Sequence, residues 1–455
     1  INFVTEELFT TTQGSGVKAK AILTFGTSVN TDWEDLGVTI DHYDVEFKKS
    51  TEASFQGAGT SQGTNFEFFD IEPALYEFRV RAVNTVGVAS EFSSTTQRIY
   101  GLTAVPSDVS NLFLRADSNT ATLSWTPTAD LDVKIGGFYE IRHNSLTSGA
   151  VWAQSTQIGE AVSGIANSTE VPLLVGTYLI KAVDSTGFKS ANATTVVNTV
   201  TPDLFQSAQF LTRTENPSFA GTKANMVVID EKLKLEADTL FDSLGLIDEV
   251  GLIDAAGGVD LSGTYDFANV IDTGIAAASY RLTSAFAFTT NSTSDFIDTR
   301  SGNIDSYESF DLNTYDDVEV QLQIATTNDD PSGSPTFSDF QNFRIGNYFG
   351  RAFKFRLLVT SGDVTHQVYI TSLSATLEAF QKFDTQQLTS STSSLGVTFG
   401  QGFLVTPKIA VTAQNMASGD FYEITSVSST GFTITFKNSS GTIVARTFDY
   451  IARGF

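Results

Sequence analysis

Cysteine is absent from this 455-residue chain, which excludes both a disulfide framework and a thiolate metal site. Basic residues are scarce: 27 Lys and Arg stand against 52 Asp and Glu, giving a formal net charge of −25. Nucleic-acid backbones and anionic lipids both require clustered cations, so we expect neither as a partner. No apolar run reaches the roughly 18 residues of a membrane span, and we expect no membrane insertion.

Residues suited to catalysis are also few. The three histidines, His42, His143 and His366, fall in separate predicted domains without an adjacent Ser or Asp motif. Nucleophile-elbow, zinc-protease and phosphate-loop motifs are absent. Pairs of carboxylates suited to a glycosidase arise by chance among 52 acidic residues. We therefore expect no enzyme, no catalytic residues, no metal and no cofactor.

What the chain does contain is β-forming sequence, with 37 Phe and many Thr and Ser. The length allows about three to five domains. The chain opens at Ile1 without Met or a signal pattern. We interpret it as a fragment or processed product with further sequence upstream.

Residues 1–100 and 101–202 form a tandem repeat. The segment AVNTVG at 82–87 is answered by AVDSTG at 182–187, with a serine three residues later in both. Each copy has an aromatic strand in its middle and another leading into the repeated segment, and Trp125 is expected in the core of the second copy. Residues 76–90 resemble the late strand of fibronectin type III domains, and residues 178–190 match its second half. The resemblance implies two immunoglobulin-like sandwiches of about seven strands, which usually act as spacers.

Residues 203–260 differ in character. The stretch EKLKLEADTLFDSLG favours a helix with Leu233, Leu240 and Leu244 near one side, followed by a Gly-rich loop. The repeated GLID at 245–248 and 251–254 has two readings, a metal loop or a plain helix-to-loop connector, and we favour the connector. A helical connector is expected over 203–260.

Strands return in residues 261–380. Four sets of alternating apolar residues each define one strand face: Leu282, Ser284, Phe286 and Phe288; Val318, Val320, Leu322 and Ile324; Phe353, Phe355, Leu357 and Val359; and Leu373, Ala375 and Leu377.

The segment TTNDDPSGSPTFSDFQNF within residues 261–380, followed by RAFKFR, resembles a jelly-roll, galactose-binding-like sandwich that precedes the tip in phage tail proteins. Two Trp positions of that pattern hold Phe337 and Phe340, and its Arg position holds Ala325. The resemblance implies the fold and leaves a Trp-dependent sugar platform in doubt.

The loop Asn328–Gly333 gathers side-chain oxygens before and after Pro331. Such oxygens suit Ca²⁺, which takes six to eight of them. The same residues form side-chain-capped turns before proline. The spacing is not that of an EF-hand, and the remaining ligands would have to come from elsewhere in the chain, so the turn is the favoured interpretation.

Residues 381–455 form a small C-terminal β domain of about five short strands. Ile409, Val411 and Ala413 share one face, Phe432, Ile434 and Phe436 share another, and SSTG and NSSG supply turns.

One loop of this domain combines amides, a carboxylate and two aromatic rings, which are the side chains typical of glycan-binding sites. Its candidate receptor-binding residues are Gln414, Asn415, Asp420, Phe421 and Tyr422. The alternative is that an aromatic ring packs inward and Asp420 stabilises a turn. Arg446 and Asp449 are candidates for an ion pair at an interface, which would contribute appreciably only if it were buried between subunits.

The pattern TAQN…GDFYEI…TGFTITF…VARTFDYIARG in this C-terminal domain resembles tail-tip, host-specificity proteins of tailed phages. The resemblance implies a virion component at the distal end of the tail, a homotrimer that contacts other tail-tip proteins and a host-surface receptor, protein or glycan. Three alternatives remain: a secreted carbohydrate-binding or adhesin protein with fibronectin spacers, a tail scaffold without receptor contact, and a glycan depolymerase, for which no groove is evident.

Overall fold

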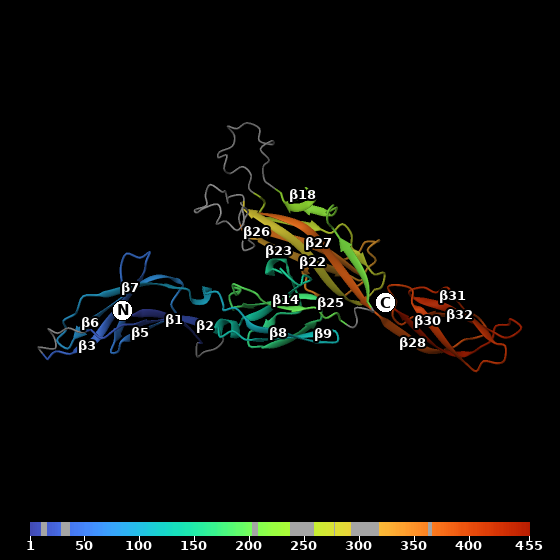
Figure 1. Ribbon diagram of the computed structural model, residues 1–455, viewed down its shortest axis with the longest axis horizontal. Coiled ribbons are helices and arrows are strands. Elements are labelled where there is room, and N and C mark those ends of the chain that lie inside the picture. The colour runs from blue at the N-terminus through green and yellow to red at the C-terminus, as the bar shows by residue number, and fades with distance from the viewer. Residues whose placement is uncertain are drawn as a thin grey trace, which may run out of the picture.

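The chain is a series of β modules in the computed structural model (Figure 1). The structure describes residues 1–10, 16–28, 37–202, 208–236, 259–276, 278–292, 318–362 and 366–455. In these parts the helical elements are one four-residue α-helix, α2 (Leu131–Lys134), and two 3-10 turns, η1 (Gly101–Thr103) and η2 (Trp152–Gln154). No described helix is long and apolar enough to cross a membrane.

The first module, residues 1–100, is a sandwich of two antiparallel sheets. One sheet has the order β1-β2-β5 and the other β4-β3-β6-β7. The strands are β1 (Phe3–Thr10), β2 (Val17–Thr24), β3 (Ile40–Lys49), β4 (Gln56–Ser61), β5 (Asn65–Phe69), β6 (Ala74–Asn84) and β7 (Ser93–Ile99). Alternate residues of β6, among them Tyr76, Phe78 and Val80, are buried in its core.

The second module, residues 101–202, repeats this strand order. Its sheets run β13-β9-β8 and β11-β10-β14-β15, with β12 also paired to β10. The strands are β8 (Ser110–Asp117), β9 (Thr120–Thr126), β10 (Phe138–Asn144), β11 (Thr156–Gln157), β12 (Val162–Ser163), β13 (Ser168–Pro172), β14 (Gly176–Val183) and β15 (Thr194–Asn198). Trp125 is 5% exposed and packs edge-on against Tyr139, as expected of a core residue.

The repeated turns have the same hydrogen bonds in both modules. Asn84 Oδ1 accepts from the backbone N–H of Val86 (3.1 Å) and of Val88 (2.8 Å). Asp184 Oδ1 accepts likewise from Thr186 (2.8 Å) and Phe188 (3.0 Å). Each side chain therefore caps the turn that follows its strand, and the sequence repeat is confirmed as a structural repeat. Together, the two sandwiches of three and four main strands have the expected fibronectin type III-like form.

A larger sandwich follows, which we call the central sandwich (208–380), and the described residues of this range form two sheets of six strands each. One runs β18-β19-β27-β22-β25 with β16 on β27, and the other β17-β20-β26-β23-β24 with β21 on β26. The strands of the first sheet are β16 (Ala208–Thr214), β18 (Met226–Ile229), β19 (Lys232–Leu235), β22 (Ser279–Ser292), β25 (Gly346–Phe349) and β27 (His366–Phe380). Those of the second are β17 (Thr222–Ala224), β20 (Ser262–Asp266), β21 (Ile271–Asp272), β23 (Val318–Thr327), β24 (Gln341–Asn342) and β26 (Ala352–Ser361).

The helical connector expected over 203–260 is wrong in its described part. Residues 208–236 hold the strands β16 to β19, all paired within the central sandwich. The predicted helix would have started at Glu231, but Lys232–Leu235 is strand β19, with Leu233 and Leu235 fully buried. The alternation of Lys and Leu in these four residues fits a half-buried strand, and burial outweighs the helix propensity of both residue types. Residues 237–258, with Leu240, Leu244 and both GLID segments, lie outside the described residues.

The four alternating sets predicted in this region are confirmed as strand faces of β22, β23, β26 and β27, and their apolar members are buried. These faces form the interior between the two sheets.

The C-terminal module, residues 381–455, is a small sandwich of two three-stranded sheets, β28-β33-β30 and β29-β32-β31. The strands are β28 (Lys382–Thr389), β29 (Leu395–Thr398), β30 (Lys408–Gln414), β31 (Phe421–Thr425), β32 (Gly431–Lys437) and β33 (Thr447–Gly454). Phe432, Ile434 and Phe436 are buried, and Ile409, Val411 and Ala413 pack against them from the facing sheet, as expected. This core is separate from that of the central sandwich.

Candidate functional site

The loops between strands gather at the two ends of the C-terminal module. Lys382 lies opposite Gly454 at the end next to the central sandwich, where the chain terminus also lies (Figure 1). Thr447 lies opposite both Thr389 and Gln414 at the other end. The loops 390–394, 415–420 and 438–446 therefore meet there, and we call them the distal loops. All five candidate receptor-binding residues belong to this end.

Asp420 and Arg446 hold two of the distal loops together. The Asp420 side chain is 2% exposed, and its Oδ2 accepts from Arg446 Nε (2.8 Å) and from the backbone N–H of Ala417 (2.7 Å). Arg446 and then the Ala417 N–H lower the pKa of this carboxyl, so it is ionised at neutral pH. Asp420 therefore has the turn-stabilising role that was the alternative prediction. The partner of Arg446 is Asp420 of the same chain.

Gln414 is engaged as well. Its Nε2 donates to Asp449 Oδ2 (2.6 Å), and Gln387 Nε2 donates to Asp449 Oδ1 (3.2 Å). These bonds run across the sheet β28-β33-β30 and fix the ends of its strands. The predicted ion-pair residue Asp449 thus binds two amides.

The other three candidates are exposed. Asn415 adopts a left-handed conformation (φ 57°), which Asn tolerates better than most residues. Phe421 is 44% exposed and lies near Lys437, whose Nζ is 6.0 Å from the ring centroid. Tyr422 is 39% exposed, and its ring leans on buried Phe436 at 5.6 Å. Asn415 of the distal loops and the first two residues of β31, Phe421 and Tyr422, therefore present one amide and two rings to solvent. The frame beneath them is fixed by Asp420 and Gln414.

The loop 328–333 is shaped by its own carboxylates. Asp330 Oδ1 accepts from the backbone N–H (2.9 Å) and hydroxyl (2.6 Å) of Ser332, and Asp330 Oδ2 pairs with Arg351 at 3.0 Å. Asp329 Oδ2 accepts from Thr336 N (2.8 Å). The favoured turn interpretation is confirmed, because these bonds are those of a capped turn.

Phe340 lies beneath two cations. Arg356 Cζ is 4.1 Å and Lys354 Nζ 5.6 Å from its ring centroid. A cation over an aromatic face is an attractive contact in its own right. One face of this ring is thus occupied by the protein itself.

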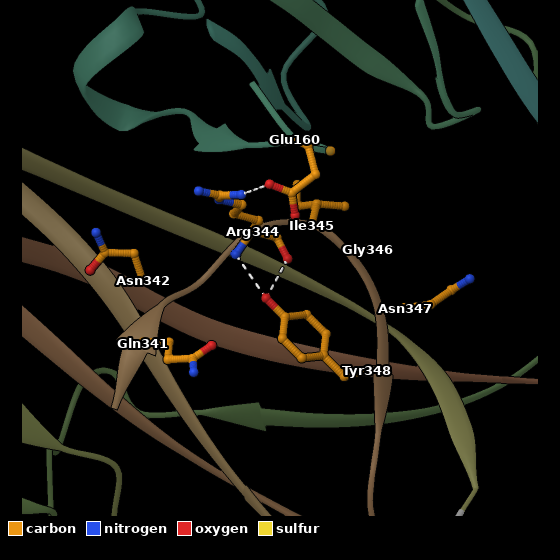
Figure 2. A pocket seen from close by; sticks show the side chains of 9 residues that line it. Glu160, Gln341, Asn342, Arg344, Ile345, Gly346, Asn347 and Tyr348 are labelled. Atoms are coloured by element: carbon orange, nitrogen blue, oxygen red, sulfur yellow. Dashed lines mark hydrogen bonds and ion pairs between the residues drawn. The ribbon is translucent and has the colours of Figure 1, made fainter. Parts of the chain in front are cut away.

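A cleft lies where the second module meets the central sandwich (Figure 2). It has a volume of about 540 Å³ and is lined by the segment that crosses from β24 to β25, together with Gly159 and Glu160. Gln341 and Asn342 lie on one side and Asn347 on the other, with Glu160 and Arg344 at one end. In the sequence, the cleft corresponds to the run QNFRIGNY at 341–348, which is rich in amides. No sequence pattern indicates that this run lies next to Gly159 and Glu160, so the sequence alone does not predict the cleft.

No family model and no curated protein matches the chain. It aligns with the FN1–FN3 domains of chicken CNTN1 over 39% of its own length and 62% of theirs, at 17% identity and a TM-score of 0.18. The chain thus spans less than two thirds of that segment. It also aligns with a two-domain fibronectin type III segment of chicken tenascin, over 43% of its own length and 98% of the segment, at 15% identity and a TM-score of 0.22. Because both TM-scores are low, the assignment of two fibronectin type III-like domains in an all-β, multi-sandwich chain rests on the strand order above.

Proposed function

We propose that this chain is a structural protein of a phage tail tip or central fibre, and that it attaches the particle to the host surface through the distal loops and the adjoining start of β31. The proposal builds on the resemblance of residues 396–454 and of the segment 326–356 to tail-tip proteins. The observation that carries it is the exposure of Phe421 and Tyr422 at the end of the C-terminal module that faces away from the central sandwich. Loops on a rigid β frame are a common place for recognition.

The mechanism is multivalent attachment. Three copies lie coaxially with the tail in contact with other tail-tip proteins, and the fibronectin type III-like modules supply reach. Three weak sites on one particle bind at a high effective concentration, so the particle is held more tightly than by any single site. The receptor is a surface protein or glycan, since exposed rings and amides suit both.

A cell-binding assay with fluorescently labelled protein on a panel of bacterial strains tests this function. We expect the Phe421→Ala/Tyr422→Ala variant to lose at least about tenfold in binding to any strain the parent chain binds, because buried aromatic anchors dominate most interfaces. Phe383→Ala is the matched control: this residue is 61% exposed but lies at the other end of the same module.

Equal losses in the Phe421/Tyr422 variant and the Phe383 control would contradict a distal binding site. A parent chain that binds no strain would favour the tail-scaffold alternative. Cell binding by a chain that lacks residues 381–455 would favour the adhesin alternative, in which the sandwiches bind.

A further inference from the structure

A second cavity lies between the second module and the outer face of the sheet that contains β22 and β27. Its volume of about 490 Å³ falls within the roughly 300–1,000 Å³ typical of small-molecule sites. The sheet forms one wall, and the second module forms the other with His143, Ser145, Leu174 and Val175. Val175 and Ala285, which both line the cavity, are exposed, so solvent reaches it from their side.

The side chains of the sheet wall point in one direction. Ser374, Thr376 and Glu378 alternate along β27. Their neighbours on β22 that also line the cavity are Thr283 and Ala285, which lie directly across the sheet. Alternate residues of a strand share a face, and so do residues directly opposite each other on antiparallel strands. All five side chains therefore leave the same face of the sheet and meet in the cavity.

Glu378 has one carboxylate oxygen engaged and one free. The residue is 5% exposed, and Arg281 contacts its Oε2 through both Nε and Nη2. Among the described residues, none donates a hydrogen bond to Glu378 Oε1. An ionised carboxylate accepts hydrogen bonds at both oxygens. The free oxygen of this buried side chain is therefore available to a donor on a ligand.

The charge that faces the cavity is negative. Of the described residues that line it, Glu378 alone is charged at neutral pH. Burial lowers the pKa of His143 to about 4, so this imidazole is neutral there. Burial raises the pKa of the Glu378 carboxyl, and Arg281 offsets this only in part. The charge of the carboxylate is thus incompletely compensated, and a cationic donor at Oε1 would stabilise it.

The cavity is formed before any ligand binds, because the second module is held against the sheet. Gln154 Nε2 donates to Phe288 O (2.6 Å), and the hydroxyls of Thr156 and Ser284 share a hydrogen bond (2.9 Å). The second module and the central sandwich also contribute to one hydrophobic cluster. A preformed site lowers the entropic cost of binding.

We propose that this cavity binds a small primary amine, whose ammonium group donates to Glu378 Oε1 and whose carbon body packs against Leu174 and Val175. A neutral donor such as an alcohol would leave the charge of the carboxylate uncompensated, and an anion would be repelled by it. The site is independent of the distal loops and goes beyond the attachment function above.

Saturation-transfer difference NMR on the full chain tests the proposal. The probes are n-butylamine and benzylamine, and n-butanol and benzyl alcohol are their uncharged counterparts with the same carbon body. We expect at least one amine to bind, at least about tenfold more tightly than its alcohol, because a hydrogen bond to a charged group contributes that much. Glu378→Gln keeps the shape and removes the charge, so it should weaken amine binding by about tenfold and change alcohol binding little.

A second variant leaves the ion pair intact, since Glu378→Gln also deprives buried Arg281 of its anionic partner. Ala285→Phe places a ring at the exposed side of the cavity and should abolish amine binding. Ala410→Phe adds the same ring at an exposed position of β30 and is expected to bind like the parent chain. Thermal unfolding of each variant verifies that it is folded.

The proposal is overturned if neither amine binds, or if the alcohols bind as tightly as the amines. It is also overturned if a folded Glu378→Gln or Ala285→Phe variant binds amines like the parent chain. The Phe421→Ala/Tyr422→Ala variant is expected to bind amines normally. Loss of cell binding with retained amine binding therefore separates the distal function from this site.

Discussion

The contact between Asp420 and Arg446 shapes the outer end of the C-terminal module. The carboxylate is nearly inaccessible to solvent and receives hydrogen bonds from two loops, 415–420 and 438–446. Gly419 beside it adopts a positive φ of 88°, and a Cβ there would meet the Ser439 side chain at 2.8 Å. The two loops are therefore held close together. Phe421 and Tyr422 directly follow Asp420 in the chain, so the backbone that carries their exposed rings is anchored at Asp420.

We predict that Asp420→Asn lowers the melting temperature of the C-terminal module at neutral pH, because the Arg446 guanidinium loses its anionic partner. The matched control is Glu423→Gln. Glu423 pairs with Lys437 at 2.7 Å in the same module but is 51% exposed, and such surface pairs contribute little. Circular dichroism melts of both variants make the comparison.

Acid should remove the difference between Asp420→Asn and the parent chain. Folding lowers the pKa of Asp420, so its stabilising contribution is present above the unfolded-state pKa and is lost as the pH falls through the folded-state value. A parent chain and variant with equal melting temperatures at neutral pH would show that the ion pair does not fix the loops.

At the scale of single elements, the end of strand β19 is held by a side-chain amide, which makes the two hydrogen bonds that a neighbouring strand would otherwise make. Gln367 is buried, its Oε1 accepts from Leu235 N (3.1 Å), and its Nε2 donates to Leu235 O (3.0 Å). The backbone of Leu235 is thus satisfied where its pairing with β27, through Leu233 and Lys234, has ended.

We predict that Gln367→Leu destabilises the central sandwich by about 1–3 kcal/mol for each buried backbone group that loses its partner. Urea unfolding followed by tryptophan and tyrosine fluorescence measures the change. Gln386→Leu, at an exposed position of β28, is the control and should leave the midpoint unchanged. An unchanged midpoint in Gln367→Leu would mean that Leu235 is satisfied in another way.

The elements also show what a sequence can reveal. Alternation over five or more residues identified β6, β22, β23, β26, β27 and β32. Burial of one strand face requires an apolar side chain at every second residue, and this pattern is visible in the sequence. The four residues of β19 are too short for that signal, and their helix-favouring neighbours dominated the prediction. At the distal end, a ligand site and a capped turn use the same residue types. The sequence therefore could not show that Asp420 is buried in a turn whereas Tyr422 is exposed. The cleft amides required the docking of two modules, which no local pattern encodes.

At the scale of the whole molecule, the second module and the central sandwich share one hydrophobic core. A single cluster of buried residues runs from Trp125 and Tyr139 to Phe286 and Ile345. A parallel backbone bridge between Ile158 and Ile345 joins them further. The first module and the C-terminal module each have a core of their own.

We predict three unfolding transitions in differential scanning calorimetry, because cooperative units follow continuous cores. Trp125→Ala should lower the stability of the middle unit by about 3–5 kcal/mol, the usual cost of truncating a large buried ring. The central sandwich should melt together with the second module in this variant. Four transitions, with only the second module shifted, would contradict a shared core.

Multivalent attachment requires that three copies present their distal loops together at one end of a tail. The mass of the full chain in solution, measured by multi-angle light scattering, tests this most directly. We predict a particle of three times the chain mass of 49.0 kDa at micromolar concentration. A particle of 49.0 kDa across that range would contradict the trimer and with it the multivalent mode of attachment.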